Sequence, residues 1–172
     1  MTMRHLCHTA VCSAVCLLIL LLAGCTAGTD RDLLWYQDGM SAAILTESDS
    51  GRVWRIVPTD GGFTAELTEP ASVRGITFTV SETEAYASAG DVRIPVTDAM
   101  LTGARRALSC LTLSEDDLTG IDPSPEGGVT ARFTAENAQY ELRIAPDGLP
   151  AAAELRENGT VFRYEITVET EP

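Results

Sequence analysis

The densest group of side chains that could do chemistry is a run of carboxylates in the middle of the chain: Glu115, Asp116, Asp117, Asp122 and Glu126. Hard oxygen ligands of this kind can bind calcium, and two facing carboxylates can cleave glycosidic bonds. The spacing does not match an EF-hand loop, and Ser114 followed by three acids is typical of a capped helical turn. We therefore predict a solvated turn and no metal, with a calcium site or a carboxylate hydrolase as less favoured alternatives.

A second reactive group is the thiol of Cys25, which ends the short motif LAGC. The motif follows an apolar run, Ala10 to Ala23, that is too short to span a bilayer as a helix but suits the core of a signal peptide. The motif resembles the lipobox of bacterial lipoproteins, in which the cysteine takes a diacylglyceryl group before the chain is cut in front of it. We expect a signal peptide at 1–24 and a lipidated cysteine with a tether at 25–30. An ordinary secretory signal with an accidental cysteine is the alternative.

Cleavage at that point leaves very few catalytic groups. Both histidines lie in the segment that is removed, and the sequence has no lysine. A Ser-His-Asp triad, a Schiff-base lysine and a histidine-ligated metal are therefore excluded. The remaining thiol, Cys110, has no evident base nearby in the sequence and is best interpreted as a small buried apolar residue. We predict that the protein is not an enzyme and carries no cofactor.

The charge balance points away from nucleic acid as a partner. Residues 25–172 carry 11 arginines and 25 acidic side chains, which gives a net charge of −14. Nucleic-acid affinity comes largely from basic side chains on phosphates, and attraction to anionic lipid needs a basic cluster. We therefore expect the diacylglyceryl anchor alone to hold the protein on the extracytoplasmic face of the cell membrane. Adjacent Arg105 and Arg106 could bind a phosphate or lipid headgroup, but solvation or pairing with the surplus acids is the favoured interpretation.

Alternation of apolar and polar residues dominates the rest of the chain and predicts short antiparallel strands. Asn158-Gly159 is a strong signal for a tight hairpin between the last two strands. The stretch 120–128, rich in glycine and proline, is predicted to be a loop. The expected strands cover 43–47, 52–57, 63–68, 73–80, 86–88, 92–96, 129–134, 140–144, 151–156 and 160–169.

One segment has helical periodicity instead. Asp98 to Leu111 places a set of apolar residues on one helical face, and Gly103 within it costs up to ~1 kcal/mol relative to alanine. The residues of the apolar face are Met100, Leu101, Ala104, Leu108 and Leu111. These elements together predict a mainly β fold with minor α: one domain, 31–172, built as a curved antiparallel half-barrel of about nine or ten strands with one main helix inserted midway. A single helix covers only part of such a sheet, so the rest must curl on itself or leave an apolar concavity.

Several local segments resemble the LolA/LolB-like lipoprotein carriers. Glu69-Pro70 followed by Val73, Gly75 and Phe78 is similar to a segment of LolA-like lipoproteins of Gram-positive bacteria. The stretches Tyr140-Glu141-Leu142, Asp147-Gly148-Leu149-Pro150 and Asn158-Gly159 resemble the closing hairpins of such domains. The resemblance implies a half-barrel closed over by helices, with an apolar cavity for lipid. A related lipoprotein of clostridial spore germination implies a second possibility, work through a protein partner.

The candidate ligand-binding residues are aromatic side chains on the apolar faces of the predicted strands: Trp54, Phe78, Phe133, Tyr140, Phe162 and Tyr164. For any one of them, an ordinary place in the core is the favoured alternative. Two functions follow. The first is a membrane-anchored lipoprotein that binds a lipid or other hydrophobic ligand, which requires an apolar cavity. The second is a non-catalytic scaffold for a protein partner in cell-envelope or spore processes, which requires a filled concavity and an exposed apolar patch.

Overall fold

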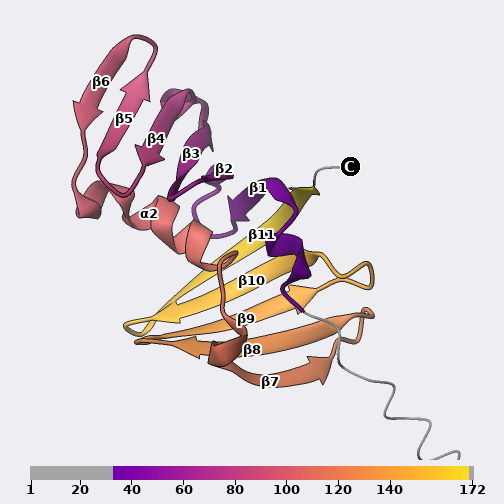
Figure 1. Cartoon of the computed structure of the whole chain (residues 1–172). Coiled ribbons are helices and arrows are strands. Elements are labelled where there is room, and N and C mark those ends of the chain that lie inside the picture. Colours follow the sequence, from indigo (N-terminus) through magenta and orange to yellow (C-terminus); the bar gives the residue numbers. More distant parts are fainter. Residues whose placement is uncertain (1–32, 171–172) are drawn as a thin grey trace, which may run out of the picture. The chain divides into compact units, whose positions relative to one another are not determined.

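Eleven antiparallel strands make one sheet in residues 33–170, the part of the chain that the computed structural model describes (Figure 1). Their alternating apolar residues place one face of the sheet toward a common core. The first six strands are β1 (Met40–Glu47), β2 (Val53–Thr59), β3 (Gly62–Glu69), β4 (Ile76–Val80), β5 (Ala85–Ala89) and β6 (Val92–Pro95). The other five are β7 (Leu118–Pro123), β8 (Val129–Ala135), β9 (Ala138–Ile144), β10 (Pro150–Glu157) and β11 (Thr160–Thr170).

The sheet consists of two meanders joined side by side. Its strand order is β6-β5-β4-β3-β2-β1-β11-β10-β9-β8-β7, so the pairing of β1 with β11 joins the first strand to the last. The connection from β6 to β7 carries the one α-helix in the described residues, α2 (Asp98–Ser109). Three short 3₁₀ turns complete the fold: η1 (Trp35–Gln37), η2 (Ala71–Val73) and η3 (Glu115–Asp117).

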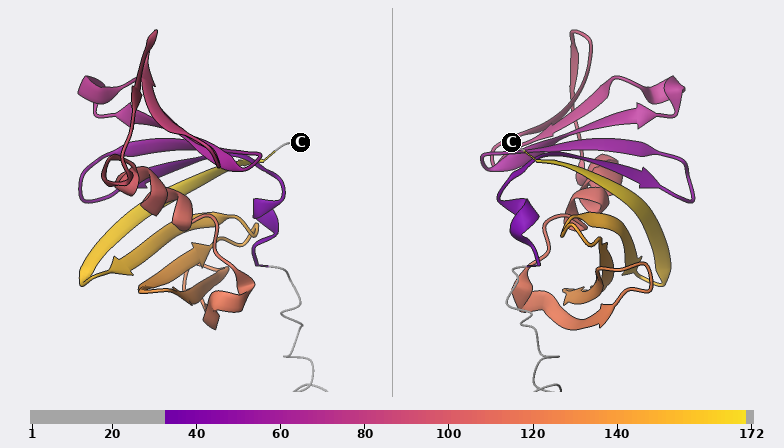
Figure 2. Two further views of the ribbon diagram at one scale, coloured as in Figure 1. Left: turned by 60° about the vertical axis from the view of Figure 1, so that its left-hand side comes forward. Right: turned by 90° about the vertical axis from the view of Figure 1, so that its right-hand side faces the viewer.

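The sheet curves strongly but does not close into a barrel. Figure 2 shows β11 to β7 curling around, while β4 to β6 extend away from them. The two edge strands, β6 and β7, both end on a proline, Pro95 and Pro123. A proline donates no backbone hydrogen bond, and short proline-ended edges resist pairing with another chain. Both edges are therefore poorly suited to pairing with a further strand.

The predicted hairpin between the last two strands is confirmed. Glu157 pairs with Thr160, which leaves Asn158 and Gly159 as the two residues of the turn. Both have positive φ, 51° and 77°, as a type I′ turn requires. Asparagine tolerates this left-handed conformation and glycine adopts it without steric cost, which explains why the pair specifies the turn.

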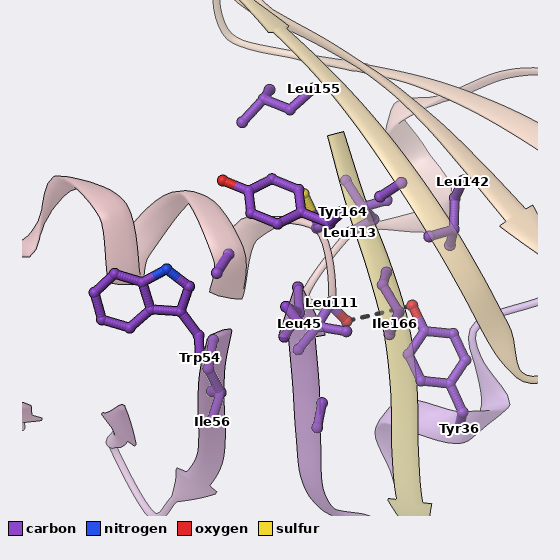
Figure 3. Packing of buried hydrophobic residues seen from close by; sticks show 14 of the residues in the cluster. Tyr36, Leu45, Trp54, Ile56, Leu111, Leu113, Leu142, Leu155, Tyr164 and Ile166 are labelled. Carbon is purple, nitrogen blue, oxygen red and sulfur yellow. Dashed lines mark hydrogen bonds between the residues drawn. The ribbon is translucent and has the colours of Figure 1, made fainter. Parts of the chain in front are cut away.

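The core lies on the concave side of the sheet. Its largest fully buried side chains come from strands, from η1, from α2 and from the segment after α2. Figure 3 shows Leu111 and Leu113 lying over the strands beside Tyr36, whose hydroxyl donates a hydrogen bond to the carbonyl oxygen of Leu111 at 3.4 Å. The Nε2 of Gln37 donates to the carbonyl oxygen of Leu113 at 2.9 Å, so η1 and the segment after α2 are fastened together.

Helix α2 packs on the sheet through small residues. Leu101, Ala104 and Ala107 are buried, and a Cβ at Gly103 would lie 3.0 Å from Cζ2 of Trp54. Glycine at this position therefore lets the helix approach the indole closely, which offsets its poor helix propensity. Of the residues predicted on the apolar face of the helix, Met100 is 47% exposed.

The predicted fold class is confirmed, with two corrections. The sheet has eleven strands, because residues 118–123, which overlap the predicted loop 120–128, form the edge strand β7. A register shift between Leu118 and Gly120, together with the final Pro123, interrupts the alternation that would have revealed it. The predicted strand 73–80 begins later, at Ile76, after the turn η2.

The predicted signal peptide at 1–24, the lipidation site Cys25 and the tether at 25–30 lie outside the described residues. Within residues 33–170, no helix has both the length and the apolar character needed to cross a membrane.

Candidate functional site

The apolar face of the sheet changes from closed to open along a single row of paired residues. The row runs from β1 to β6 through Ala43, Ile56, Ala65, Phe78, Ala87 and Ile94. Cross-strand partners point to the same side of a sheet, so all six share the concave side. Ala43, Ile56 and Ala65 are fully buried, Phe78 is half-buried, Ala87 is buried and Ile94 is 48% exposed. The covering of the core is therefore incomplete from β4 onward and is lost at β6.

The incompletely covered part is defined here as the open apolar face: Ile76, Phe78, Val80, Val92 and Ile94. Val92 is 64% exposed and is, like Ile94, one of the few large apolar side chains this accessible in the described residues. Met100, on the first turn of α2, follows β6 closely in the chain and is another. Large exposed apolar side chains that gather in one place are typical of a binding surface.

Two of the predicted ligand-binding residues lie at the border of this face. Trp54 is 5% exposed beneath α2, and its ring centroid lies 6.1 Å from that of Phe78 in a tilted arrangement. Phe78 is half-buried and belongs to the open apolar face itself. The aromatic pair therefore connects the closed core to the exposed strands.

Two others lie within the core. Phe133 and Tyr164 are 1% and 2% exposed, in the part of the sheet that the chain's own side chains fill. Burial raises the pKa of Tyr164, so its phenol stays neutral at physiological pH. In this structure both side chains contribute packing to the core, and neither is accessible to a ligand.

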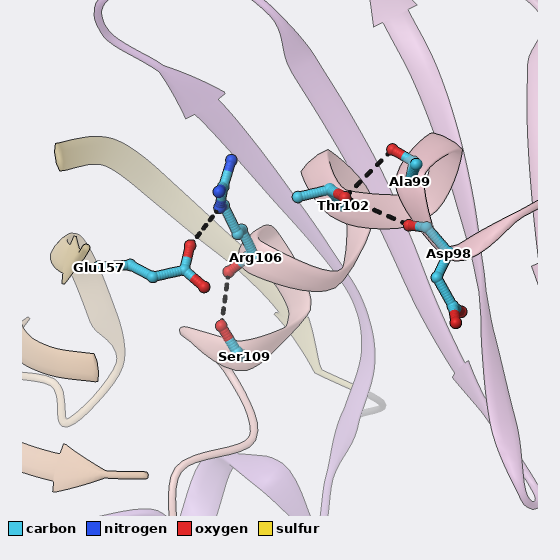
Figure 4. A network of polar contacts seen from close by, with 6 residues as sticks. All are labelled: Asp98, Ala99, Thr102, Arg106, Ser109 and Glu157. Atoms are coloured by element: carbon cyan, nitrogen blue, oxygen red, sulfur yellow. Dashed lines mark hydrogen bonds and ion pairs between the residues drawn. The ribbon is translucent and has the colours of Figure 1, made fainter. Parts of the chain in front are cut away.

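The last two, Tyr140 and Phe162, are half-buried near the C-terminal end of α2. The Arg106 guanidinium lies 4.1 Å above the Phe162 ring, and its Nε donates to Glu157 on β10 at 2.7 Å (Figure 4). Tyr140 and Leu155 help to line a surface pocket of about 330 Å³ between this part of the helix and the sheet. The arginine thus fixes α2 to β10 and is already paired with a carboxylate, as the surplus of acids predicted.

The carboxylate cluster is explained by capping and ion pairs. The Ser114 hydroxyl accepts a hydrogen bond from the backbone N–H of Asp116, as the capped turn predicted. Asp122 pairs with Arg132, and Glu126 pairs with Arg143. Among the described residues, no group of three or more His, Cys, Asp or Glu side chains has an arrangement that could hold a metal ion.

Another pair of carboxylates meets on the convex side of the sheet. Glu141 and Glu154 are direct cross-strand partners on β9 and β10. Partial burial alone would raise the pKa of Glu154, but hydrogen bonds and charges from Arg156 and Arg163 outweigh it, and the pKa lies below its usual value. Glu154 therefore remains ionised, which is the opposite of what a general acid in a glycosidase needs.

Cys110 is confirmed as a buried residue in the described part of the chain, where it is the free cysteine. Burial raises the pKa of its thiol to about 12 and raises that of Tyr36 to about 12 as well. A thiol in this state is protonated at neutral pH and is a poor nucleophile. Its place in the structure is that of a small apolar core residue.

Sequence reasoning missed Val92 and Ile94 as site residues. Their strand was predicted, and their alternation with Arg93 and Pro95 was visible in the sequence. Their exposure comes from the position of β6 at the edge of the sheet, beyond the cover of α2. Strand order is a tertiary property, so no local signal in the chain indicates it.

The structure thus defines a class: a mainly β protein with an open, curved antiparallel sheet, one helix on the concave side and an apolar face exposed at one end of residues 33–170. The sequence matches no protein-family model and no curated protein.

Two solved structures are similar in part. An uncharacterized conserved protein from Thermus thermophilus has 17% sequence identity and a TM-score of 0.43, over 84% of this chain and 90% of that one. A LolA superfamily protein from Nitrosomonas europaea has 10% identity and a TM-score of 0.36, over 85% of this chain and 95% of that one. Such low scores assign neither a family nor a function to the chain.

Proposed function

We propose that the protein is a membrane-anchored, extracytoplasmic lipoprotein that binds a lipid or other hydrophobic ligand without catalysing a reaction. Its anchor is the diacylglyceryl group predicted on Cys25, and its ligand lies on the open apolar face. The observation that carries the proposal is the exposure of Val92 and Ile94 in line with the half-buried Phe78. A LolA/LolB-like relationship is part of this proposal and rests on the sequence resemblance.

The ligand site proposed here is smaller than the whole half-barrel. A ligand inside the whole half-barrel would have to displace Leu111, Leu142 and Tyr164, each almost completely buried. On the open apolar face it displaces only water. Covering the exposed parts of Val92 and Ile94 contributes about 1 kcal/mol each, on the scale of ~25 cal/mol per Å² of apolar surface.

A second function, docking of an envelope protein, is favoured by a specific observation. The most exposed apolar residues lie on β6, the outermost strand, where a large partner has access from the side. The concavity near β8 to β11 is filled, as the scaffold hypothesis requires. Protein docking would use the same face as lipid binding, so the same substitutions would weaken both functions. Identifying the bound molecule as a lipid or a protein distinguishes the two functions.

Native mass spectrometry of the full chain, extracted from bacterial membranes in mild detergent, tests the proposal. We expect a lipid-sized adduct that dissociates on denaturation. Ile94→Asp should lower adduct occupancy by roughly tenfold, because it places a charge in the apolar contact. Thr79→Asp is the matched control: it adds the same charge to the opposite side of β4 and should leave the adduct unchanged. A mass without adduct, unchanged after incubation with envelope lipids, would contradict lipid binding and favour the protein partner.

A further inference from the structure

We propose that the protein has a second binding site, a groove beside the C-terminal half of α2 that binds an uncharged carbohydrate. This site is separate from the open apolar face and goes beyond the proposed function. It consists of two neighbouring surface cavities of about 330 and 530 Å³. Both volumes lie within the ~300–1,000 Å³ that is usual for small-molecule sites.

The two cavities form one groove because they share lining residues. Ser109 of α2, Ala138 and Tyr140 of β9, and Glu157 of β10 border both cavities. One wall is α2 with the segment that follows it, and the other is formed by the tips of the β8–β9 and β10–β11 hairpins. Figure 4 shows Ser109 and Glu157, one from each wall. We call this space the α2 groove.

The two walls of the α2 groove are fastened to each other. The Nε of Arg106 on α2 donates to Glu157 on β10 at 2.7 Å, and its guanidinium lies over the Phe162 ring of β11. Ala107 of the helix is fully buried against the core. The groove is therefore formed before a ligand arrives, and binding pays little for ordering the protein.

An aromatic ring borders the groove along both cavities. Tyr140 lies in a cross-strand row between Phe133 and Leu155, each 1% exposed, which place it on the concave side of the sheet. Tyr140 itself is half-buried, and its hydroxyl makes no hydrogen bond within residues 33–170. The face of an aromatic ring carries partial negative charge, to which the polarised C–H bonds of a sugar ring are complementary.

Uncharged hydrogen-bonding groups surround that ring. The amides of Asn137 and Asn158, at the two hairpin tips, make no hydrogen bond in the described structure, so each offers two donors and an acceptor. The hydroxyls of Ser109 and Thr112 donate to backbone carbonyl oxygens of α2 at 2.9 and 3.2 Å, which leaves their lone pairs to accept. Donors and acceptors in this mixture match sugar hydroxyls, which both donate and accept.

The charges along the groove disfavour an anionic ligand. Its two arginines, Arg105 and Arg106, are each paired with a carboxylate, at 2.9 and 2.7 Å. Asp117 and Glu136, on opposite walls of the larger cavity, form no ion pair within residues 33–170 and would repel a phosphate or a uronic acid. The groups available to a ligand are therefore an aromatic ring and neutral polar atoms, which fits an uncharged carbohydrate.

Saturation-transfer NMR of the full chain in nanodiscs of neutral phosphatidylcholine tests this inference, with empty nanodiscs as the blank. The neutral probes are maltotriose, cellotriose and chitotriose; trigalacturonate and trilysine are the charged probes. We expect saturable transfer to a neutral sugar, with the signal of trigalacturonate weaker by roughly threefold or more. Absence of transfer to all three neutral sugars, or stronger transfer to either charged probe, would overturn the inference.

Variants at the groove and a matched control locate the binding. Tyr140→Ala should weaken the affinity for the sugar by roughly tenfold or more, and Tyr140→Phe, which keeps the ring, by about threefold. Asn137→Ala changes only an exposed turn and should weaken it by about three- to tenfold. Gln139→Ala removes an exposed amide from the opposite side of β9 and should leave the affinity unchanged.

The same variants separate this site from the lipid site. Because all of these positions lie away from β4 to β6, the lipid adduct of the proposed function should persist in every variant that folds. Sugar binding that is unaffected by Asn137→Ala, or equally weakened by Gln139→Ala, would overturn the inference even if Tyr140→Ala failed to fold. Loss of the lipid adduct with sugar binding intact would contradict the proposed function alone.

Discussion

Strands β8 to β11 and strands β4 to β6 present the same kind of alternating apolar face, but the chain covers them differently. In the first group, the closed half, Leu142 and Ala131 are fully buried beneath the segment that follows α2. In the second group, the open half, Val92 and Ile94 remain exposed and all five residues of β4 are only half-buried. The sheet alone therefore does not decide what is core; the covering segments do.

The difference assigns separate tasks to the two halves. The closed half buries enough apolar surface to hold the fold together, and its buried aromatics are occupied by packing. The open half keeps apolar surface accessible at a cost in stability, which is expected where a protein binds something. Helix α2 marks the border, with Trp54 beneath Gly103 on one side and Arg106 bound to Glu157 on the other.

The largest effect should come from truncating one side chain in each half. Leu142→Ala leaves a cavity in the closed half and should lower the free energy of unfolding by about 2–5 kcal/mol. Ile94→Ala in the open half should cost less than about 1 kcal/mol, because the side chain is already 48% exposed. Urea unfolding measures both. Equal losses would mean that the open half is as well packed as the closed one.

The packing of α2 on Trp54 at this border should depend on the size of the side chain at position 103. Gly103→Val places side-chain atoms against the indole of Trp54, where even a Cβ lies 3.0 Å from Cζ2. We expect a loss of about 1–3 kcal/mol and a red shift of the Trp54 emission as the helix moves away. Thr102→Val, at the neighbouring position, controls for an added apolar group. An unshifted spectrum in Gly103→Val would show that α2 does not rest on Trp54.

Two adjacent arginines of α2 are expected to contribute differently to stability at that border. Arg106→Ala removes an ion pair with Glu157 and the stacking on Phe162, and should cost about 1 kcal/mol. Arg105→Ala removes only a pair with Asp98, whose side chain is 87% exposed, and should change stability by less than ~0.5 kcal/mol. Thermal unfolding of the two variants compares them directly. The reverse order would contradict the role given to Arg106.

The smallest effect concerns the pH dependence of the closed half. Glu154 has a pKa below its usual value in the folded protein, so its stabilising contribution is present above the unfolded pKa of about 4. The contribution is lost as the pH falls through the folded pKa. Glu154→Gln should therefore be less stable than the parent by roughly 0.5 kcal/mol at pH 7, and equal to it near pH ~2. A stability difference between Glu154→Gln and the parent that stays the same from pH 7 to pH ~2 would contradict this prediction.

Local signals predicted most of the fold. Ten of the strands, the helix and the Asn158-Gly159 turn follow from periodicity and turn chemistry, because each depends on neighbours in sequence. The strand β7 was not predicted, because Gly120 and Pro123 interrupt the alternation of apolar and polar residues. The exposure of Met100 was not predicted, because helical periodicity indicates an apolar face but not how far the sheet beneath that face extends.

The candidate site was predictable only in part. An aromatic side chain on an apolar strand face has the same local pattern whether its strand is covered or open. Phe133 and Phe78 therefore looked alike in the sequence, although one is buried and the other lies at the open apolar face. The distinction depends on the strand order and on where α2 lies, which are set by contacts far apart in the chain.

The chain's two tryptophans allow the most direct test of where the ligand binds. Trp54 lies next to the open apolar face, whereas Trp35 lies on η1, 45% exposed and close to Gly148 in the closed half. A brominated alkyl ligand should be titrated into two full-chain variants, Trp35→Phe and Trp54→Phe, in neutral nanodiscs. We predict saturable quenching of Trp54 and no saturable quenching of Trp35. Saturable quenching of Trp35, with Trp54 unaffected, would contradict the assignment of binding to the open half.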